Sequence, residues 1–279
     1  MLENTREVGA VDSSATLAMP VETVTQPDVA LAGGREGRLP FTVRVVDDDE
    51  ALARALRMRQ AAYHRHVPEF ARTMDQPETY DRDPGGLVLL AESKLGRSPV
   101  GTMRIQSNCF RPLALEQSLE LPDWLSGRLA GATRLGVEAG EAGRMVKMGL
   151  FKALYLYCVR ERIDWMAIAA RTPLDRQYAA LQFCDVFGVK EFIPLAHAAN
   201  IPHRIMAFEV GTTERRWREA AHPLYDFMLA THHPDIDLSA APSLDWPDAA
   251  KPVRDQRRQM TGSGSNSADA MHRQTSLTQ

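Results

Sequence analysis

Hydrophobic and polar residues alternate in several short segments of the chain, and these segments predict β-strands. The first is FTVRVV at 41–46, where β-branched residues are frequent. Two more, at 86–92 and 99–106, flank the turn SKLGRS and predict an antiparallel pair. Further strands are predicted at 132–138, 164–171, 189–195 and 201–210.

Between these strands, apolar residues recur at helical spacing. The acids at 47–49 offer an N-cap for a helix whose apolar stripe also carries Arg59. That arginine either lays its stem along the core with its head in water or presents a functional guanidinium. Helices are also predicted at 148–163, at 173–183, and at 212–231 with a kink at Pro223. Residues 107–131 are predicted to be irregular, with one short helix.

This order of elements predicts an α/β (α+β) fold in which helices flank one mixed central sheet. Residues 1–40 contain no aromatic residue and no isoleucine, and 248–279 are similarly polar. Such segments bury too little to offset their ordering entropy. We therefore predict disordered tails at 1–40 and 248–279 around a single domain at 41–247.

Composition excludes some classes of function. The 279 residues include 33 Lys and Arg against 36 Asp and Glu, a net charge of −3, which argues against a nucleic-acid partner. No apolar run approaches the roughly 20 residues that span a bilayer, and the N-terminus lacks a secretory signal pattern. Three widely spaced cysteines fit reduced thiols, so a cytoplasmic protein is predicted.

A glycine-rich segment, EAGEAGRMVK at 138–147, joins a predicted strand to a predicted helix. Glycines allow a ligand to approach the backbone closely, and the first N–H groups of a helix attract anions. The segment matches neither the P-loop nor the dinucleotide motif. An ordinary strand-to-helix loop with solvated basic residues remains the alternative. The candidate cofactor-binding residues are Gly140, Gly143, Arg144, Lys147 and Gly149.

Two strings add a family resemblance. Val137-Glu138-Ala139-Gly140-Glu141-Ala142 resembles the coenzyme-A loop of the GNAT superfamily of N-acyltransferases, with the leading basic residue lost. Tyr178-Ala179-Ala180-Leu181-Gln182-Phe183 resembles the downstream Tyr-x-x-Leu-Gly-Phe of that family. The resemblance implies that the loop binds acyl-CoA or the phosphopantetheine arm of an acyl carrier protein. It also implies that Tyr178 protonates the departing thiolate. The alternative is that Tyr178 is an ordinary core or surface-facing tyrosine on an amphipathic helix.

Four further motifs, over roughly 41–210, resemble the autoinducer synthases and the long-chain N-acyl amino acid synthases. In order they are Met58-Arg59-Gln60-Ala61-Ala62-Tyr63, Gln76-Pro77-Glu78-Thr79-Tyr80-Asp81, Gly101-Thr102-Met103-Arg104 and Ala132-Thr133-Arg134-Leu135. Gly131 stands where the family has a glutamate, and a family tryptophan is missing between Tyr63 and Gln76. These departures favour the N-acyl amino acid synthase side over lactone synthesis.

The resemblance implies a set of roles. Asp81 or Glu138 would replace the missing glutamate as base, and Glu78 and Asp83 would hold the acceptor amine. Arg59, Arg104 and Arg134 either hold an acceptor carboxylate or pair structurally with Asp81 and Asp83. No histidine or cysteine spacing predicts a metal site.

The function so implied is transfer of a fatty acyl group from acyl carrier protein or acyl-CoA to a small amine, most simply an amino acid. An acyl-homoserine lactone synthase using S-adenosylmethionine is one alternative. A catalytically silent module that binds acyl carrier or acyl-CoA is the other.

Overall fold

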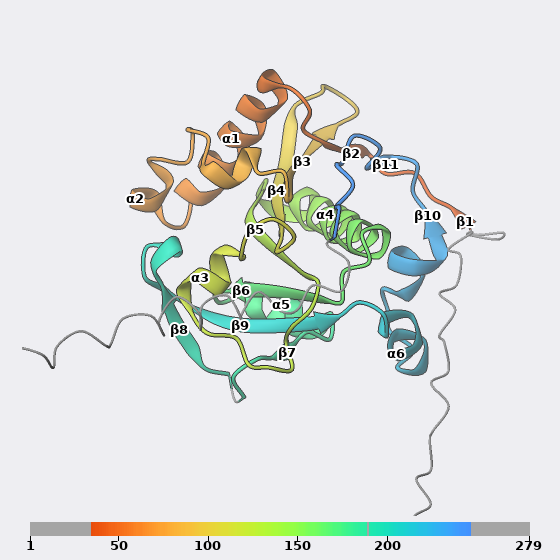
Figure 1. Ribbon diagram of the computed structural model, residues 1–279. Coiled ribbons are helices and arrows are strands. Elements are labelled where there is room, and N and C mark those ends of the chain that lie inside the picture. The colour runs from red at the N-terminus through yellow and green to blue at the C-terminus, as the bar shows by residue number, and fades with distance from the viewer. Residues whose placement is uncertain (1–34, 189, 247–279) are drawn as a thin grey trace, which may run out of the picture. The chain divides into compact units, whose positions relative to one another are not determined.

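The computed structural model describes residues 35–188 and 190–246, which form a nine-stranded mixed sheet flanked by helices (Figure 1). The α/β fold predicted from the sequence is confirmed. The predicted tails lie outside the described residues except at 35–40, where the predicted boundary is wrong. There Leu39 is buried, and β1 (Arg35–Glu36) pairs with β10 (Thr231–His232).

The sheet joins an N-terminal antiparallel half to a C-terminal half. The predicted hairpin is confirmed, since β3 and β4 pair antiparallel, and β4 pairs antiparallel with β5. Along the sheet the strands are β11 (Ile236–Asp237), β2 (Phe41–Val45), β3 (Gly86–Ser93), β4 (Pro99–Ser107), β5 (Leu129–Val137), β6 (Trp165–Ala170), β9 (Ile201–Glu209) and β7 (Cys184–Asp185), with β8 (Phe192–Leu195) also paired to β9.

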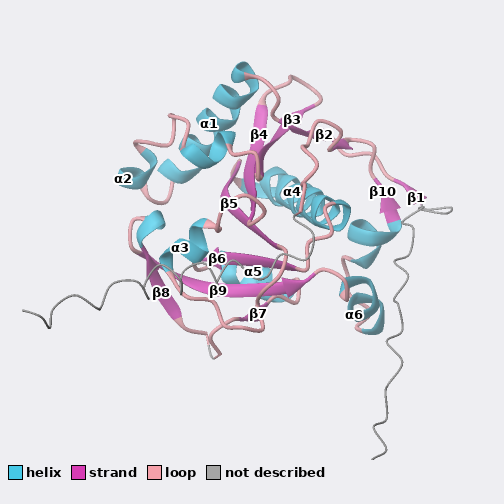
Figure 2. Ribbon diagram, viewed as in Figure 1, coloured by secondary structure: helices cyan, strands magenta, loops and turns pink. Residues whose placement is uncertain are grey.

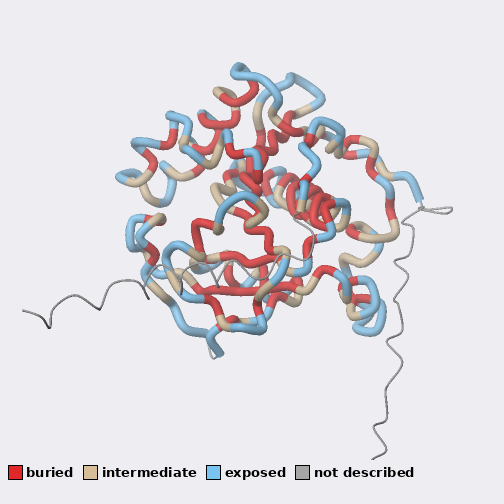
Figure 3. Tube along the Cα trace, in the orientation of Figure 1, coloured by how far each residue is buried: buried red, intermediate tan, exposed pale blue. Residues whose placement is uncertain are grey.

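Helices α1 (Asp49–His64) and α4 (Gly140–Arg160) cover opposite faces of this sheet. Successive side chains of a strand point to opposite faces. On β3, Val88 packs with the buried stripe of α1, whereas its neighbour Leu89 joins the core cluster of α4. Asp48 caps α1 by accepting the Ala51 N–H, as the acids at its start predict. Figure 3 shows the buried segments running along α4 and the strands.

The C-terminal half repeats this layering. Helices α5 (Leu174–Ala180) and α6 (Thr213–Glu219) place Tyr178 and Trp217 in the same core cluster as α4. The short α3 (Ala114–Ser118) instead packs with a second cluster that contains Ala167 of β6. Since Met166 joins the first cluster, α3 lies on the face opposite α4.

Strands β5 and β6 separate soon after they meet. They pair in parallel only where Leu129 and Ala130 face Trp165 and Met166. Beyond that point, within the described ranges, β5 pairs only with β4, and β6 only with β9. A bulge adds one residue to β5, where Arg134 has a φ of 55°. The sheet therefore opens between the C-terminal parts of β5 and β6, which we call the divergence.

The single kinked helix predicted at 212–231 is wrong. Helix α6 ends at Glu219, and a separate π-helical turn, η3 (Asp226–Ala230), follows (Figure 2). Proline lacks an N–H and clashes with the preceding turn, and Ala221, two residues before Pro223, has a φ of 46°. The chain therefore leaves the helix before the proline instead of bending through it.

Candidate active site

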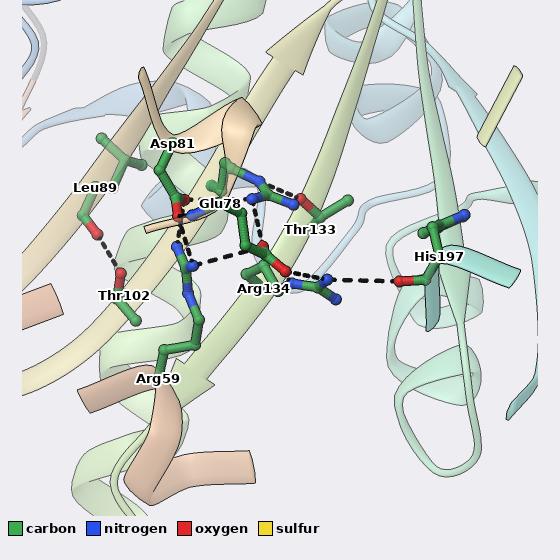
Figure 4. Close-up of polar contacts among 9 residues, drawn as sticks. Arg59, Glu78, Asp81, Leu89, Thr102, Thr133, Arg134 and His197 are labelled. Atoms are coloured by element: carbon green, nitrogen blue, oxygen red, sulfur yellow. Dashed lines mark hydrogen bonds and ion pairs between the residues drawn. The ribbon is translucent and has the colours of Figure 1, made fainter. Parts of the chain in front are cut away.

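A cluster of charged side chains lies on the α1 face of the sheet, beside the divergence (Figure 4). Asp81, on η1 (Thr79–Arg82), accepts hydrogen bonds of 2.7 and 3.0 Å from two guanidinium nitrogens of Arg59. Both side chains are fully buried, so the head of Arg59 does not reach water. Asp81 also accepts the Glu78 N–H at 2.8 Å. The Asp81 carboxylate therefore holds Arg59 and the backbone of η1 in place. This structural role argues against its predicted role as base.

Glu78 is the most accessible member of this cluster, with a side chain 31% exposed. It accepts a bidentate pair from Arg134, at 2.8 and 2.6 Å, and a further bond of 2.6 Å from Arg104. Burial tends to raise the pKa of Glu78, but these two guanidinium groups outweigh it and lower the pKa to about 2. Arg104 also donates to Thr133 Oγ1 at 3.0 Å. Glu78 is therefore ionised at neutral pH and is a poor proton acceptor.

The cluster carries an excess of positive charge. Three guanidinium groups face two carboxylates, which leaves a net charge of +1. Asp83 does not join it, because it pairs with Arg111 at 2.5 Å and accepts the Gly85 N–H. The predicted substrate-binding residues brought together are Arg59, Glu78, Arg104 and Arg134. The expectation that Asp83 belongs with them is wrong, since Asp83 is the C-cap of η1, two positions after Asp81, and pairs with a different arginine.

The glycine-rich segment begins α4 on the other side of β5. Its N-cap residue, Ala139, makes no side-chain capping bond, so that side chain leaves the first N–H groups of the helix available. Gly140 has a φ of +82°, which favours glycine. At Gly143, a Cβ would lie 1.8 Å from the carbonyl oxygen of Glu138, so only glycine fits there. Arg144 is exposed beside this turn.

Two predicted residues occupy other positions. A Cβ at Gly149 would lie 2.7 Å from the ring of Phe41, so this glycine lets α4 pack closely on β2. The prediction that Gly149 contacts a cofactor is wrong, because the residue faces the core. Glu138 is exposed, and its N–H bonds the carbonyl of Val100 at 3.0 Å. No ion pair among the described residues joins its carboxylate to the charged cluster.

Tyr178 lies on α5, on the α4 face of the sheet. Its ring centroid is 5.1 Å from that of Phe151 and 5.0 Å from that of Phe183. The side chain is buried, and burial raises its pKa, so the phenol keeps its proton at neutral pH. The neighbouring Gln177 accepts a hydrogen bond from Lys147 Nζ. This bond links the last residue of the glycine-rich segment to the residue that precedes Tyr178.

An apolar cavity adjoins Tyr178. Its volume is about 20 Å³, which corresponds to about one water molecule. Its lining comes from α4, α5, β6, β9, α6 and η3, and includes Phe151, Phe208, Trp217 and Met228. A ligand larger than water would require side chains such as the flexible Met228 to move.

The two parts of the candidate site lie on opposite faces of the sheet. The charged cluster is on the α1 face, with Arg59 of α1 buried within it, and Tyr178 belongs to the core cluster of α4.

Two further positions bear on the chemistry. Gly131 lies at the divergence, where a Cβ would be 3.1 Å from the carbonyl oxygen of Ala167, so a long side chain is not accommodated without displacement. His197, in η2 (Ala196–Ala198), accepts a bond of 3.5 Å from Arg134 through its carbonyl. Sequence reasoning missed His197 because it stands alone in a turn, 63 residues from Arg134.

Among the described residues, no three histidine, cysteine or acidic side chains are grouped so as to hold a metal ion. None of the helices found there has the length and apolar character needed to cross a bilayer.

The sheet, its divergence and the turn into α4 give the chain the GNAT-like fold predicted from the sequence. Among solved structures, it is similar to FeeM, an N-acyl amino acid synthase from uncultured soil microbes. The identity is 18%, the match covers 67% of this chain and 98% of FeeM, and the TM-score is 0.52. That likeness establishes the fold.

Other similar structures include BjaI, described as a CoA-dependent acyl-homoserine lactone synthase. Its identity is 15%, over 69% of this chain and 93% of BjaI, with a TM-score of 0.49. LasI, an AHL synthase, is 14% identical over 61% of this chain and 90% of its own, with a TM-score of 0.47. Neither a scan of protein-family models nor a search of curated proteins gave a match.

Proposed function

We propose that this protein is an N-acyltransferase that moves a fatty acyl group from acyl-CoA or acyl carrier protein to the amine of an amino acid. The observation that carries the proposal is the pair of complementary sites at the divergence. One face offers helix N–H groups and basic side chains for a phosphate-bearing donor. The other offers a carboxylate and an excess guanidinium charge for a zwitterionic acceptor.

The charged cluster supports an amino acid as acceptor. Glu78 is the accessible carboxylate and would attract an ammonium group, while Arg134, 10% exposed, would attract a carboxylate. A zwitterion adds no net charge, so its carboxylate would lie against the excess guanidinium charge while its ammonium faces Glu78. Arg59, Arg104 and Asp81 are too buried to meet a substrate directly, and they hold the accessible pair in place.

The donor would lie on the α4 face. The N–H groups before Gly143 and the side chains of Arg144 and Lys147 would contact its phosphates. The apolar walls beside Tyr178 would receive the acyl chain once Met228 moves. The three widely spaced cysteines suit a reducing compartment, so the cytoplasm is retained as the proposed location.

The reaction joins the two faces. The acceptor nitrogen attacks the thioester carbonyl, and backbone N–H groups of β5 beyond Ala130 stabilise the oxyanion. The C–S bond then breaks, and Tyr178 donates its proton to the thiolate. Burial raises the pKa of Tyr178, so the phenol still holds its proton when the thiolate forms, although the same shift makes it a weaker acid.

The test uses the full chain with long-chain acyl-CoA or acyl carrier protein and a pool of amino acids, with products identified by mass spectrometry. Tyr178→Phe should lower kcat about 100-fold. Tyr155→Phe is the matched control, since Tyr155 is a tyrosine of the same cavity whose pKa burial raises to about 12. Equal rates for Tyr178→Phe and wild type would remove Tyr178 from the mechanism.

The assay also separates the two alternatives. Consumption of S-adenosylmethionine with release of a lactone would identify a lactone synthase. Donor binding measured by calorimetry without any N-acyl product would identify a silent acyl-binding module. The family that this chain resembles carries a glutamate at the position of Gly131, and a longer side chain would be crowded there. The absence of that carboxylate is the reason to test for a silent acyl-binding module.

A further inference from the structure

Attack of an amine on a thioester releases a proton, and the carboxylates of the charged cluster are poorly suited to accept it. Asp81 is fully buried and bound to Arg59. The pKa of Glu78 is held at about 2 by its arginine partners, which outweigh burial. Gly131 offers no side chain at all. The proton must therefore pass to a group on another element near the divergence.

His197 lies in η2, at the turn between β8 and β9, and its backbone carbonyl meets Arg134 of the charged cluster. Its carbonyl oxygen is 3.5 Å from Arg134 Nη2 (Figure 4), and its side chain is half-buried. Ala199 and Asn200, which follow, have φ angles of 55° and 56°, and Asn200 N–H returns to the carbonyl of Leu195 at 2.9 Å. Non-glycine residues keep this conformation only where the surroundings impose it. The turn therefore holds His197 in a defined place.

The hydrogen bonds of Ser118 determine which nitrogen of His197 is free. Ser118 Oγ lies 3.0 Å from the carbonyl oxygen of Ala114 and 2.7 Å from His197 Nδ1. A hydroxyl has one proton, and only a donor can face a carbonyl oxygen, so this proton goes to Ala114. Ser118 Oγ must then accept from His197 Nδ1–H. The lone pair of the neutral imidazole is therefore on Nε2.

The surroundings keep this imidazole neutral. Burial is the largest cause, and the charges of nearby cationic groups add to it, so that the pKa of His197 is lowered to about 4. The groups that act on it come from four elements: Arg134 of β5, His203 of β9 and Arg104 of β4 lower the pKa, and Glu78, the N-cap of η1, raises it. On α3, which contacts the turn, the carboxylate of Glu116 accepts the Leu113 N–H of its own helix.

We propose that His197 is the general base of the reaction, taking through Nε2 the proton that the acceptor nitrogen loses. This inference rests on the proposed acyl transfer. The acceptor ammonium first gives one proton to solvent, and the neutral nitrogen attacks. The C–N bond forms, the second proton passes from the nitrogen to His197, the C–S bond breaks, and the thiolate takes the proton of Tyr178. His197 then returns a proton to Tyr178 through solvent. A nitrogen that has attacked a carbonyl is cationic and strongly acidic, so a weak base suffices.

Ser118 is then a positioning residue, because it fixes the tautomer. An acceptor carboxylate bound at Arg134 offsets one of the charges that lower the pKa of His197. The base therefore becomes stronger when the acceptor binds, and this links the occupied acceptor site to proton removal.

The test compares kcat and KM of the full-length variants His197→Ala and Ser118→Ala with wild type. We expect His197→Ala to lower kcat about 100-fold with little change in the donor KM, and Ser118→Ala to lower kcat about tenfold. Added imidazole, and substituted imidazoles of different pKa, should restore His197→Ala in proportion to their basicity. A structural role would not give that dependence. His203→Ala is the matched control and should keep kcat within threefold of wild type.

The outcomes are separable. A wild-type protein that forms no product with any amine overturns acyl transfer and, with it, the role of His197. An active wild type whose folded His197→Ala variant keeps more than a third of kcat overturns the role of His197 alone. A large loss of kcat without rescue by any imidazole also overturns it. Circular dichroism and donor binding establish that each variant is folded.

Discussion

Glu78 offers the sharpest test of the charged cluster, because its substitution removes one charge and leaves the shape almost unchanged. In Glu78→Gln, Arg134 and Arg104 lose the carboxylate that binds them at 2.6 to 2.8 Å. Three guanidinium groups then share Asp81 as their only carboxylate in the cluster. Removing one partner from such a pair leaves uncompensated charge, which costs about 3–5 kcal/mol when the site is fully buried.

The pKa of Glu78 gives an independent magnitude. Its lowering from 4.5 to about 2, against the opposing effect of burial, corresponds to about 3 kcal/mol at neutral pH. Because the side chain is 31% exposed, screening reduces this to about 2–3 kcal/mol. A carboxylate whose pKa is lower in the folded state contributes fully above its unfolded pKa. Its contribution is lost as the pH falls toward the folded value, so only about 1 kcal/mol remains near pH 3.

The assay is urea unfolding followed by tryptophan fluorescence, at pH near 7 and near 3. Glu78→Gln should be less stable than wild type by about 2–3 kcal/mol near pH 7, and the difference should shrink to about 1 kcal/mol near pH 3. Glu69→Gln is the matched control. Its exposed pair with Arg72 should contribute less than about 0.5 kcal/mol at either pH. A stability difference that stays constant across this range would refute the charge assignment of Glu78.

Three other outcomes test the rest of the molecule. Gly143→Ala should weaken CoA binding, measured by calorimetry, by about tenfold or more, because its Cβ meets the Glu138 carbonyl; equal affinity would contradict the role of the turn. Lys152→Met should lower the free energy of unfolding by about 2–4 kcal/mol, since Lys152 donates to two backbone carbonyls, one at 2.7 Å. A loss below about 0.5 kcal/mol in urea titrations would argue against this. Thiol labelling followed by mass spectrometry should modify exposed Cys184 in the native protein. Cys158, whose pKa burial raises, should react only after unfolding, and labelling it in the native state would contradict the packing of α4.

Much of the fold could be predicted because its elements have strong local signals. The alternation at 41–46 and in the hairpin, and the stripe and N-cap of α1, are properties of neighbouring residues, and the structure confirms them. The pairing of Arg59 with Asp81 was predicted only as an alternative to substrate binding, and the pairing of Arg134 with Glu78 was not predicted. The last helix was misjudged because a π-helical turn continues the helical spacing after Pro223.

Hydrophobic periodicity and capping act within a few residues, so most of the architecture could be predicted from local patterns. Which candidate residues share a site depends instead on how distant segments pack together. Asp83 and Asp81 are two residues apart but have different arginine partners, and Gly149 faces Phe41 although the same segment begins at a ligand-accessible turn. His197 reaches Arg134 only because the turn between β8 and β9 lies close to β5. Such contacts depend on how separate elements pack against one another, and no local pattern in the chain encodes the distance between two such elements.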